Sequence, residues 1–156
     1  VLLAVDLSSE ATWAKALPTA QRLLDDGGAL HVVTVFPDIT LVSGYFEADF
    51  EAKAMAGLAE QQSTWIQEHA PGAIGHLKSG SIHGEVITVA KEIDADAIVM
   101  ASHRPGLTDY VIGATAARVV SHASQSVMNK KKGRCGSRLI RQFLLCRSPG
   151  SSGNAR

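Results

Sequence analysis

Short apolar runs alternate along this chain with segments in which apolar residues recur every three or four positions. The runs are typical of strands buried on both faces, and the recurring positions are typical of helices that cover a sheet. The runs predict strands at residues 1–5, 29–36, 73–78 and 97–101. The periodic segments predict helices at residues 11–24, 51–69, 86–93 and 113–123. This alternation favours an α/β fold with an open, mainly parallel sheet and helices on both faces.

Turn-forming residues separate these predicted elements. Ser8 or Ser9 is a candidate cap for the first helix, and the glycines that bracket residues 80–84 are typical of a turn. Residues 38–50 show no clear period, and we interpret them as a loop. The predicted elements therefore follow one another through short connections and one longer loop.

Charge divides the chain into two unequal parts. The 156 residues carry 15 Lys and Arg against 15 Asp and Glu, so the formal net charge is zero. Residues 1–129 hold all 15 acidic residues and only seven basic ones, while residues 130–156 hold eight basic residues and no acid. A chain of this length fits one domain. We therefore expect a domain at residues 1–128 and an atypical basic tail, irregular or disordered, at residues 129–156.

The basic tail has two interpretations. Residues 125–128 begin another apolar run, but Asn129 and three lysines follow, so only four strands are clear. The mixed composition after Gly133 is typical of a chain read past its proper end, which a comparison of the coding reading frames would test. Alternatively, eight positive charges suffice to contact nucleic acid or an acidic membrane. We prefer the first interpretation and expect no nucleic-acid partner.

The sequence favours a reducing, cytoplasmic location. No segment approaches the roughly 20 consecutive apolar residues of a membrane span, and no signal peptide is recognisable. Only Cys135 and Cys146 are present, so no disulfide framework is implied. The chain opens on Val1 rather than Met, and we expect the natural protein to carry residues before it.

Polar residues after the predicted strands mark a candidate binding site. In a parallel sheet, ligands bind at the carboxyl ends of the strands, where the chain order reverses. Asp6 follows the first strand, and residues 102–109 lead from the fourth strand to Gly113, at the start of a helix. A helix N-terminus binds phosphate through free amides and its dipole, and Thr115 adds a hydroxyl. The simpler interpretation is a strand–loop–helix corner with a capping Thr.

Six short segments occur along the chain in a characteristic order: VLLAVDLS at 1–8, VVTVFP at 32–37, KSGS at 78–81, VMASHRP at 99–105, YVIGA at 110–114 and RVVSHA at 118–123. In this order they resemble the universal stress protein family, and the fourth and fifth segments are similar to those of its F- and G-type members. Each segment alone is weakly specific, but their ordered combination is specific. The resemblance covers about residues 1–128.

The resemblance implies an adenine nucleotide α-hydrolase-like fold, with a fifth strand that often joins two subunits in a homodimer. It also implies bound ATP, with Mg²⁺ as a possible companion ion. Asp6 and Val35 fall where the family holds the adenine, Val35 through its backbone. The implied nucleotide-binding positions are Asp6, Val35, Met100, Ala101, His103, Arg104, Gly113, Ala114 and Thr115.

This chain departs from the family's glycine motif, which is Gly-x-x-Gly, nine residues, then Gly-Ser/Thr. Ala101, Arg104 and Ala114 replace three motif residues, only Gly113 is retained, and the spacer has eight residues. Arg104 either pairs with phosphate oxygens or with the carboxylate of Asp109. A second departure concerns the last strand, which begins at residues 125–128 and then becomes basic, and this puts the homodimer in question.

Two function hypotheses follow. The leading one is a small regulatory stress protein that binds ATP or a related adenine nucleotide, and the alternative is a nucleotide-free interaction protein whose glycine motif has degenerated. The simpler interpretation of Asp6 is that it caps the following helix. The simpler interpretation of His103 is that it is a structural residue that forms hydrogen bonds. No nucleophile–base pair, carboxylate pair or Cys/His cluster is recognisable, so we expect no metal and at most slow ATP hydrolysis.

Overall fold

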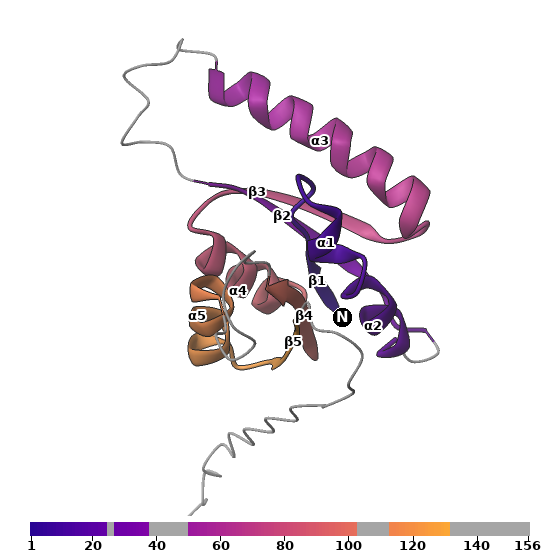
Figure 1. Cartoon of the computed structure of the whole chain (residues 1–156), viewed down its shortest axis with the longest axis vertical. Helices are drawn as coiled ribbons and strands as arrows, with labels where there is room; N and C mark the ends of the chain where they lie inside the picture. The colour runs from indigo at the N-terminus through magenta and orange to yellow at the C-terminus, as the bar shows by residue number, and fades with distance from the viewer. Residues whose placement is uncertain (25–26, 38–49, 103–112, 132–156) are drawn as a thin grey trace, which may run out of the picture.

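The apolar runs form a parallel sheet in the computed structural model (Figure 1). The structure describes residues 1–24, 27–37, 50–102 and 113–131. In chain order its elements are β1 (Leu2–Ala4), α1 (Glu10–Trp13), α2 (Leu17–Arg22), β2 (His31–Pro37), α3 (Phe50–His69), β3 (Ile74–Gly80), α4 (Ile82–Glu92), β4 (Ala97–Ser102), α5 (Ala114–His122) and β5 (Ser126–Lys131). In this part of the chain, no helix is both long and apolar enough to cross a membrane.

The five strands lie in the order β3-β2-β1-β4-β5, and every neighbouring pair is parallel. The chain adds β2 and β3 on one side of β1, then crosses back and adds β4 and β5 on the other side. This reversal places the topological switch point between β1 and β4. The predicted α/β fold with a five-stranded parallel sheet is therefore confirmed.

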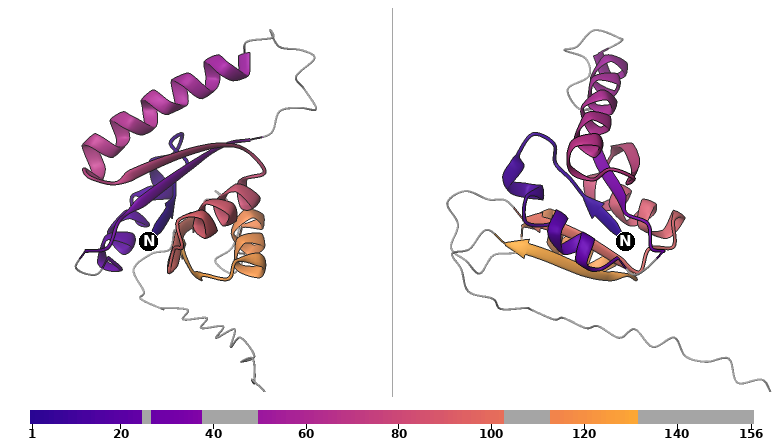
Figure 2. Two further views of the ribbon diagram at one scale, coloured as in Figure 1. Left: turned by 180° about the vertical axis from the view of Figure 1, so that it is seen from behind. Right: turned by 90° about the vertical axis from the view of Figure 1, so that its right-hand side faces the viewer.

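Helices cover both faces of the sheet (Figure 2). Leu2 and Leu3, both fully buried, point to opposite faces and belong to separate apolar layers. The layer under α4 and α5 includes Val33, Val86, Val89, Ile98 and Val119. The layer under α1, α2 and α3 includes Ala16, Leu17, Val32, Trp65 and Val99. Burial of such aliphatic side chains on both faces is the main stabilising term, at roughly 1.5–3 kcal/mol for each large one.

The helix predicted at residues 11–24 is two helices. α1 ends at Trp13, and α2 begins at Leu17 with Pro18 in its first turn. Pro18 has no amide hydrogen, and its ring would clash with the carbonyl of Ala14 in a continuous helix. The prediction followed apolar spacing alone and missed this break.

The helix α4 begins four residues earlier than the sequence predicted. The turn expected at residues 80–84 needs only Gly80 and Ser81, because Gly80 has a φ of +136° and Ser81 is the N-cap of α4. A φ of that sign strains any residue with a side chain. Gly84 therefore lies inside the helix, where glycine costs only roughly 1 kcal/mol relative to alanine.

The fifth strand, which the sequence left in question, is present. β5 pairs with β4 along six residues, from Ser126 with Ala97 to Lys131 with Ser102. Val127 packs against one apolar layer and Met128 against the other, so two residues anchor the strand on both faces. Lysines are common on edge strands, and the backbone of β4 supplies the pairing. The four-stranded alternative is wrong, and residues 129–131 extend the sheet beyond the predicted domain boundary at 128.

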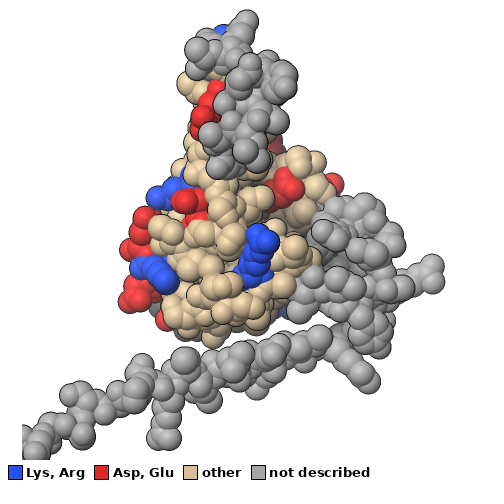
Figure 3. Space-filling model, turned by 90° about the vertical axis from the view of Figure 1, so that its left-hand side faces the viewer, with Lys and Arg blue, Asp and Glu red and all other residues tan. Residues whose placement is uncertain are grey.

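Charged side chains lie at the surface. On the face in Figure 3, acidic and basic side chains are interspersed among uncharged ones. Lys78 of β3 pairs with Glu92 of α4 at 3.1 Å, with both side chains about a third or more exposed. Exposed pairs of this kind contribute at most about 1 kcal/mol. Apolar burial rather than ion pairing therefore holds α4 on the sheet.

A buried amide fastens α3 to the other face of the sheet. The Gln62 side chain is only 6% exposed. Its Nε2 donates to the Thr34 hydroxyl and to the His76 carbonyl, each at 3.0 Å. Gly75 leaves room for this contact, because a Cβ there would lie 2.9 Å from the Gln62 Oε1. Gln62 thus links α3 to both β2 and β3.

We expect Gln62→Ala to lower the free energy of unfolding by about 1–3 kcal/mol, because it leaves the buried Thr34 hydroxyl and His76 carbonyl without their donor. The neighbouring Gln61 is exposed, so Gln61→Ala should change stability by less than about 0.5 kcal/mol. Urea denaturation of the two variants tests the difference. Equal stabilities would contradict the role of Gln62.

A second prediction concerns the end of the domain. A chain that stops after Lys131 should melt at the temperature of the full chain, because β5 is complete at that residue. A chain that stops after Gln125 should melt lower, because it lacks Val127 and Met128 and uncovers the edge of β4. Thermal melts followed by circular dichroism compare the two. Equal melting temperatures for both truncations would contradict a stabilising β5.

Candidate functional site

The carboxyl ends of β1, β2 and β4 lie at one edge of the sheet, because all five strands are parallel. We call this edge the carboxyl edge. Asp6 follows β1, Val35 lies near the end of β2, and Met100 and Ala101 lie near the end of β4. The chain returns to this edge again at the start of α5, with Gly113. Ligands of open parallel sheets bind at this edge, beside the switch point.

Asp6 forms a local turn rather than a helix cap. Its Oδ1 accepts hydrogen bonds from the Ser8 amide at 3.0 Å and from the Ser8 hydroxyl at 2.6 Å. Ser9 is the residue in the N-cap position of α1. The Thr12 hydroxyl donates to the Asp6 carbonyl at 2.9 Å and fixes the backbone of the turn. The turn therefore holds an exposed carboxylate in place directly after the central strand.

The backbone amide and carbonyl of Val35 lie on the β1 side of β2, beyond the hydrogen bond between Val5 and Val33. Val5 donates its amide to the Val33 carbonyl at 3.0 Å, and β1 itself ends at Ala4. Because strand residues alternate in the direction of their backbone groups, the amide and carbonyl of Val35 point to the same side as those of Val33. The Val35 side chain packs against the layer under α4 and α5. A ligand would therefore meet the backbone of Val35, not its side chain.

The two β4 positions differ in the face they occupy. The Met100 side chain is buried in the layer under α4 and α5. Ala101 is partly buried and packs against the opposite layer. The burial of Met100 leaves only its backbone for a ligand, whereas the partly buried Ala101 presents its backbone and a methyl group.

Among the described residues, the N-terminus of α5 has no side-chain cap hydrogen bond. Gly113 is the N-cap and makes no side-chain cap hydrogen bond, while its carbonyl accepts from the Ala117 amide at 2.9 Å. Ala114 is exposed and Thr115 is partly buried. Amides in the first turn of a helix lack intrahelical partners and bind anions. Gly113 has an ordinary φ of −56°, so its contribution is the absence of a side chain.

His103, Arg104 and Asp109 lie outside the described residues. At the carboxyl edge the structure places Asp6, Val35, Ala101 and the start of α5. The predictions that Arg104 pairs with phosphate oxygens or with Asp109, and that His103 is a nucleotide-binding position or has a structural role, remain predictions.

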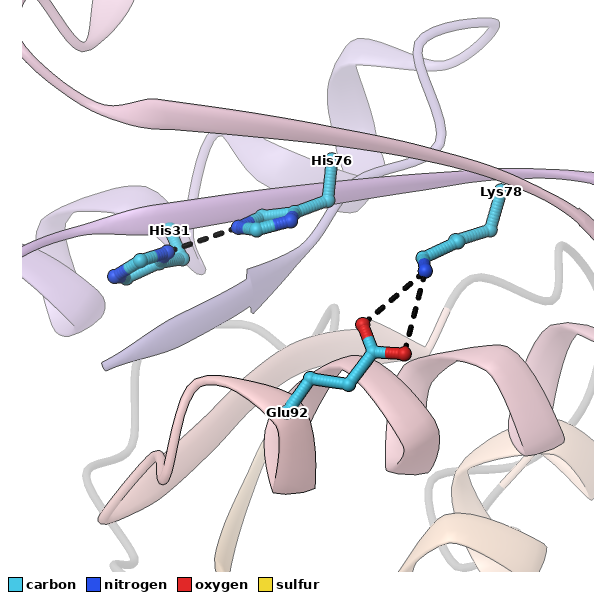
Figure 4. Close-up of polar contacts among 4 residues, drawn as sticks. All are labelled: His31, His76, Lys78 and Glu92. Atoms are coloured by element: carbon cyan, nitrogen blue, oxygen red, sulfur yellow. Dashed lines mark hydrogen bonds and ion pairs between the residues drawn. The ribbon is translucent and has the colours of Figure 1, made fainter.

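Sequence reasoning missed a contact between two histidines at the opposite edge. His31 begins β2 and His76 lies in β3, and their Nδ1 and Nε2 atoms are 2.9 Å apart (Figure 4). Burial lowers the pKa of both imidazoles. The neighbouring His76 ring lowers the pKa of His31 further. The Lys78 ammonium lowers the pKa of His76 further, and the Glu92 carboxylate acts in the opposite direction. The two residues are 45 positions apart, so only the strand pairing reveals them. Among the described residues, no three His, Cys, Asp or Glu side chains gather into a metal-binding group.

Comparison of the sequence with known proteins gives a family. Residues 1–129 match the sequence profile described as the universal stress protein family. The chain is 29% identical over 135 residues to universal stress protein G of Shigella flexneri, and the match covers 82% of this chain and 95% of that protein.

Solved structures agree on the fold. A universal stress protein from Archaeoglobus fulgidus in complex with dAMP is similar at a TM-score of 0.51 and 22% identity, covering 82% of this chain and 94% of that one. A family protein from Arabidopsis thaliana with AMP bound is similar at a TM-score of 0.51 and 18% identity, covering 85% and 92%. The fold is thus the adenine nucleotide α-hydrolase-like one. The profile match over most of the sequence shows that this chain belongs to the universal stress protein family.

Proposed function

We propose that this protein binds an adenine nucleotide at the carboxyl edge and acts as a small regulatory protein. The observation that supports the proposal is the start of α5, which lies at the carboxyl edge with Gly113 and has no side-chain cap hydrogen bond among the described residues. Structural relatives with this fold hold AMP and dAMP, which supports the same ligand class here.

Each part of the edge suits one part of the nucleotide. The first-turn amides of α5 and the dipole of that helix bind a phosphate group. The Asp6 carboxylate accepts hydrogen bonds, which fits the exocyclic amine of adenine. The backbone amide and carbonyl of Val35 supply one further donor and one further acceptor, where β1 no longer pairs with β2.

ATP is the nucleotide that we propose, with AMP and ADP as weaker ligands. One helix N-terminus accommodates one phosphate group. Residues 102–112 and Mg²⁺ would therefore neutralise the charge of the other two phosphate groups of ATP. Arg104 is the cation that this segment offers for phosphate oxygens. Nucleotide occupancy would bias the conformation of this segment and so the surface shown to a partner.

A nucleotide-free interaction protein is the second candidate. Ala101 and Ala114 stand in place of motif residues, and Ala114 offers no hydroxyl at the exposed first position of α5. The loss of one hydroxyl contact costs about 0.5–1.5 kcal/mol. The change at Ala114 alone therefore weakens nucleotide binding without abolishing it, and Arg104 offers a cation for phosphate at another altered position, so the first candidate is preferred.

We expect ATP to stabilise the protein more than ADP or AMP, and CTP to have little effect. At a nucleotide concentration about 100 times Kd, the free energy of unfolding rises by about 2.7 kcal/mol, which corresponds to roughly 5–10 °C in Tm. Differential scanning fluorimetry with millimolar nucleotide measures the shift. No shift with any adenine nucleotide would favour the second candidate.

Gly113→Asp tests the phosphate site directly. Asp is a good N-cap residue and should preserve α5, but its carboxylate repels phosphate and occupies the first-turn amides. We expect this variant to lose at least about tenfold in ATP affinity, or about 1.4 kcal/mol, with an unchanged Tm in the absence of nucleotide. The matched control is Ser81→Asp, at the N-cap of α4 on the edge strand side. Equal ATP affinities of the two variants would exclude α5 as the phosphate site.

A further inference from the structure

The pair of histidines at the amino ends of the strands is a second candidate site. We propose that His31 and His76 together bind one divalent transition-metal ion, such as Zn²⁺ or Ni²⁺, through one ring nitrogen each. His31 Nδ1 and His76 Nε2 are 2.9 Å apart, and the rings are stacked with centroids 5.1 Å apart and planes 25° apart (Figure 4). The pair shares no residue with the proposed nucleotide site at the carboxyl edge.

The spacing of the two nitrogens fits a shared metal. Imidazole nitrogens bind Zn²⁺ at about 2.0–2.1 Å. With an angle at the metal between square-planar and tetrahedral values, two such nitrogens lie about 2.9–3.4 Å apart. The observed distance is at the lower end of this range. A turn of each ring about χ2, a broad and soft torsion for His, aims both lone pairs at the metal.

The backbone holds both histidines rigidly. His31 pairs with Ile74 and His76 pairs with Val33, in parallel strands. Both imidazoles therefore lie on the face of the sheet that α4 covers, two positions apart along neighbouring strands. Sites built on strands keep their geometry better than sites on loops. Little entropy is lost in bringing the two ligands together, because the sheet has already done so.

Solvent and a metal ion can reach the pair. His31 and His76 are both only partly buried, and His31 lines a hollow of about 210 Å³ at the amino edge of the sheet. Water can fill the coordination positions that two imidazoles leave open. This is consistent with the absence, among the described residues, of a third protein ligand in a cluster.

Charged groups of both signs lie around the pair. Asp94 and Asp96 line the same hollow as His31 and are exposed. On the His76 side, the Lys78 ammonium pairs with the Glu92 carboxylate at 3.1 Å. The amino group of Val1 is the remaining positive group near His31, and it donates to the Ala29 carbonyl at 3.0 Å.

The two sites use different residues. His31 is the first residue of β2 and lies four residues, or roughly 13 Å, from Val35 along that strand, while His76 pairs with Val33, two residues from Val35. Asp6 and Gly113 lie at the carboxyl edge. Metal and nucleotide can therefore be titrated separately.

Titration of the full chain with Ni²⁺ by isothermal calorimetry tests the proposal. We expect His31→Gln and His76→Gln each to weaken the binding at least about tenfold, since loss of a supporting contact alone costs that much at metal sites. His83→Gln is the matched control, because His83 is also partly buried but contacts Ser81 instead. It should bind Ni²⁺ as the unmodified chain does.

A second measurement needs no substitution. In imidazole ¹H–¹⁵N spectra, paramagnetic Ni²⁺ should broaden the signals of His31 and His76 before those of the other four histidines. Earlier broadening elsewhere, equal affinities of all three variants, or no binding by the unmodified chain would each overturn the proposal. In the last case the contact is only a hydrogen bond with a shared proton.

Discussion

The need to cover both faces of a parallel sheet governs this molecule. The central strand β1 has only three residues, yet Leu2 and Leu3 are fully buried on opposite sides of it. Each side requires its own helices, so the chain must cross from one face to the other between β3 and β4. That crossing produces the order β3-β2-β1-β4-β5 and the switch point between β1 and β4.

Function follows from the same constraint. A helix that connects two parallel strands begins near the carboxyl edge, so the first turn of α5 lies at the same edge of the sheet as the ends of β1 and β4. The Asp6 turn and the backbone of Val35 border the same place, because β1 ends before β2 does. The opposite edge carries a pair of imidazoles instead, because the pairing of β2 with β3 brings His31 beside His76.

The sequence predicted the fold well because apolar runs such as residues 29–36 and 97–101 report burial directly. It predicted one helix where Pro18 separates two, because the spacing of apolar residues does not show that a proline lacks its amide hydrogen. It left β5 in question because Asn129 and the lysines are not aliphatic, although pairing with β4 and two anchors suffice. The turn of Asp6 onto Ser8 and the contact of His31 with His76 depend on local rotamers and strand register, which no single segment encodes.

The most direct test of the nucleotide site is a map of backbone amide shifts on addition of AMP to ¹⁵N-labelled protein. We predict the largest changes at Ser8, Val35, Ala114 and Thr115, with His31 and Asp94 unaffected. No change at α5, or the largest changes at the amino edge of the sheet, would contradict binding at the carboxyl edge.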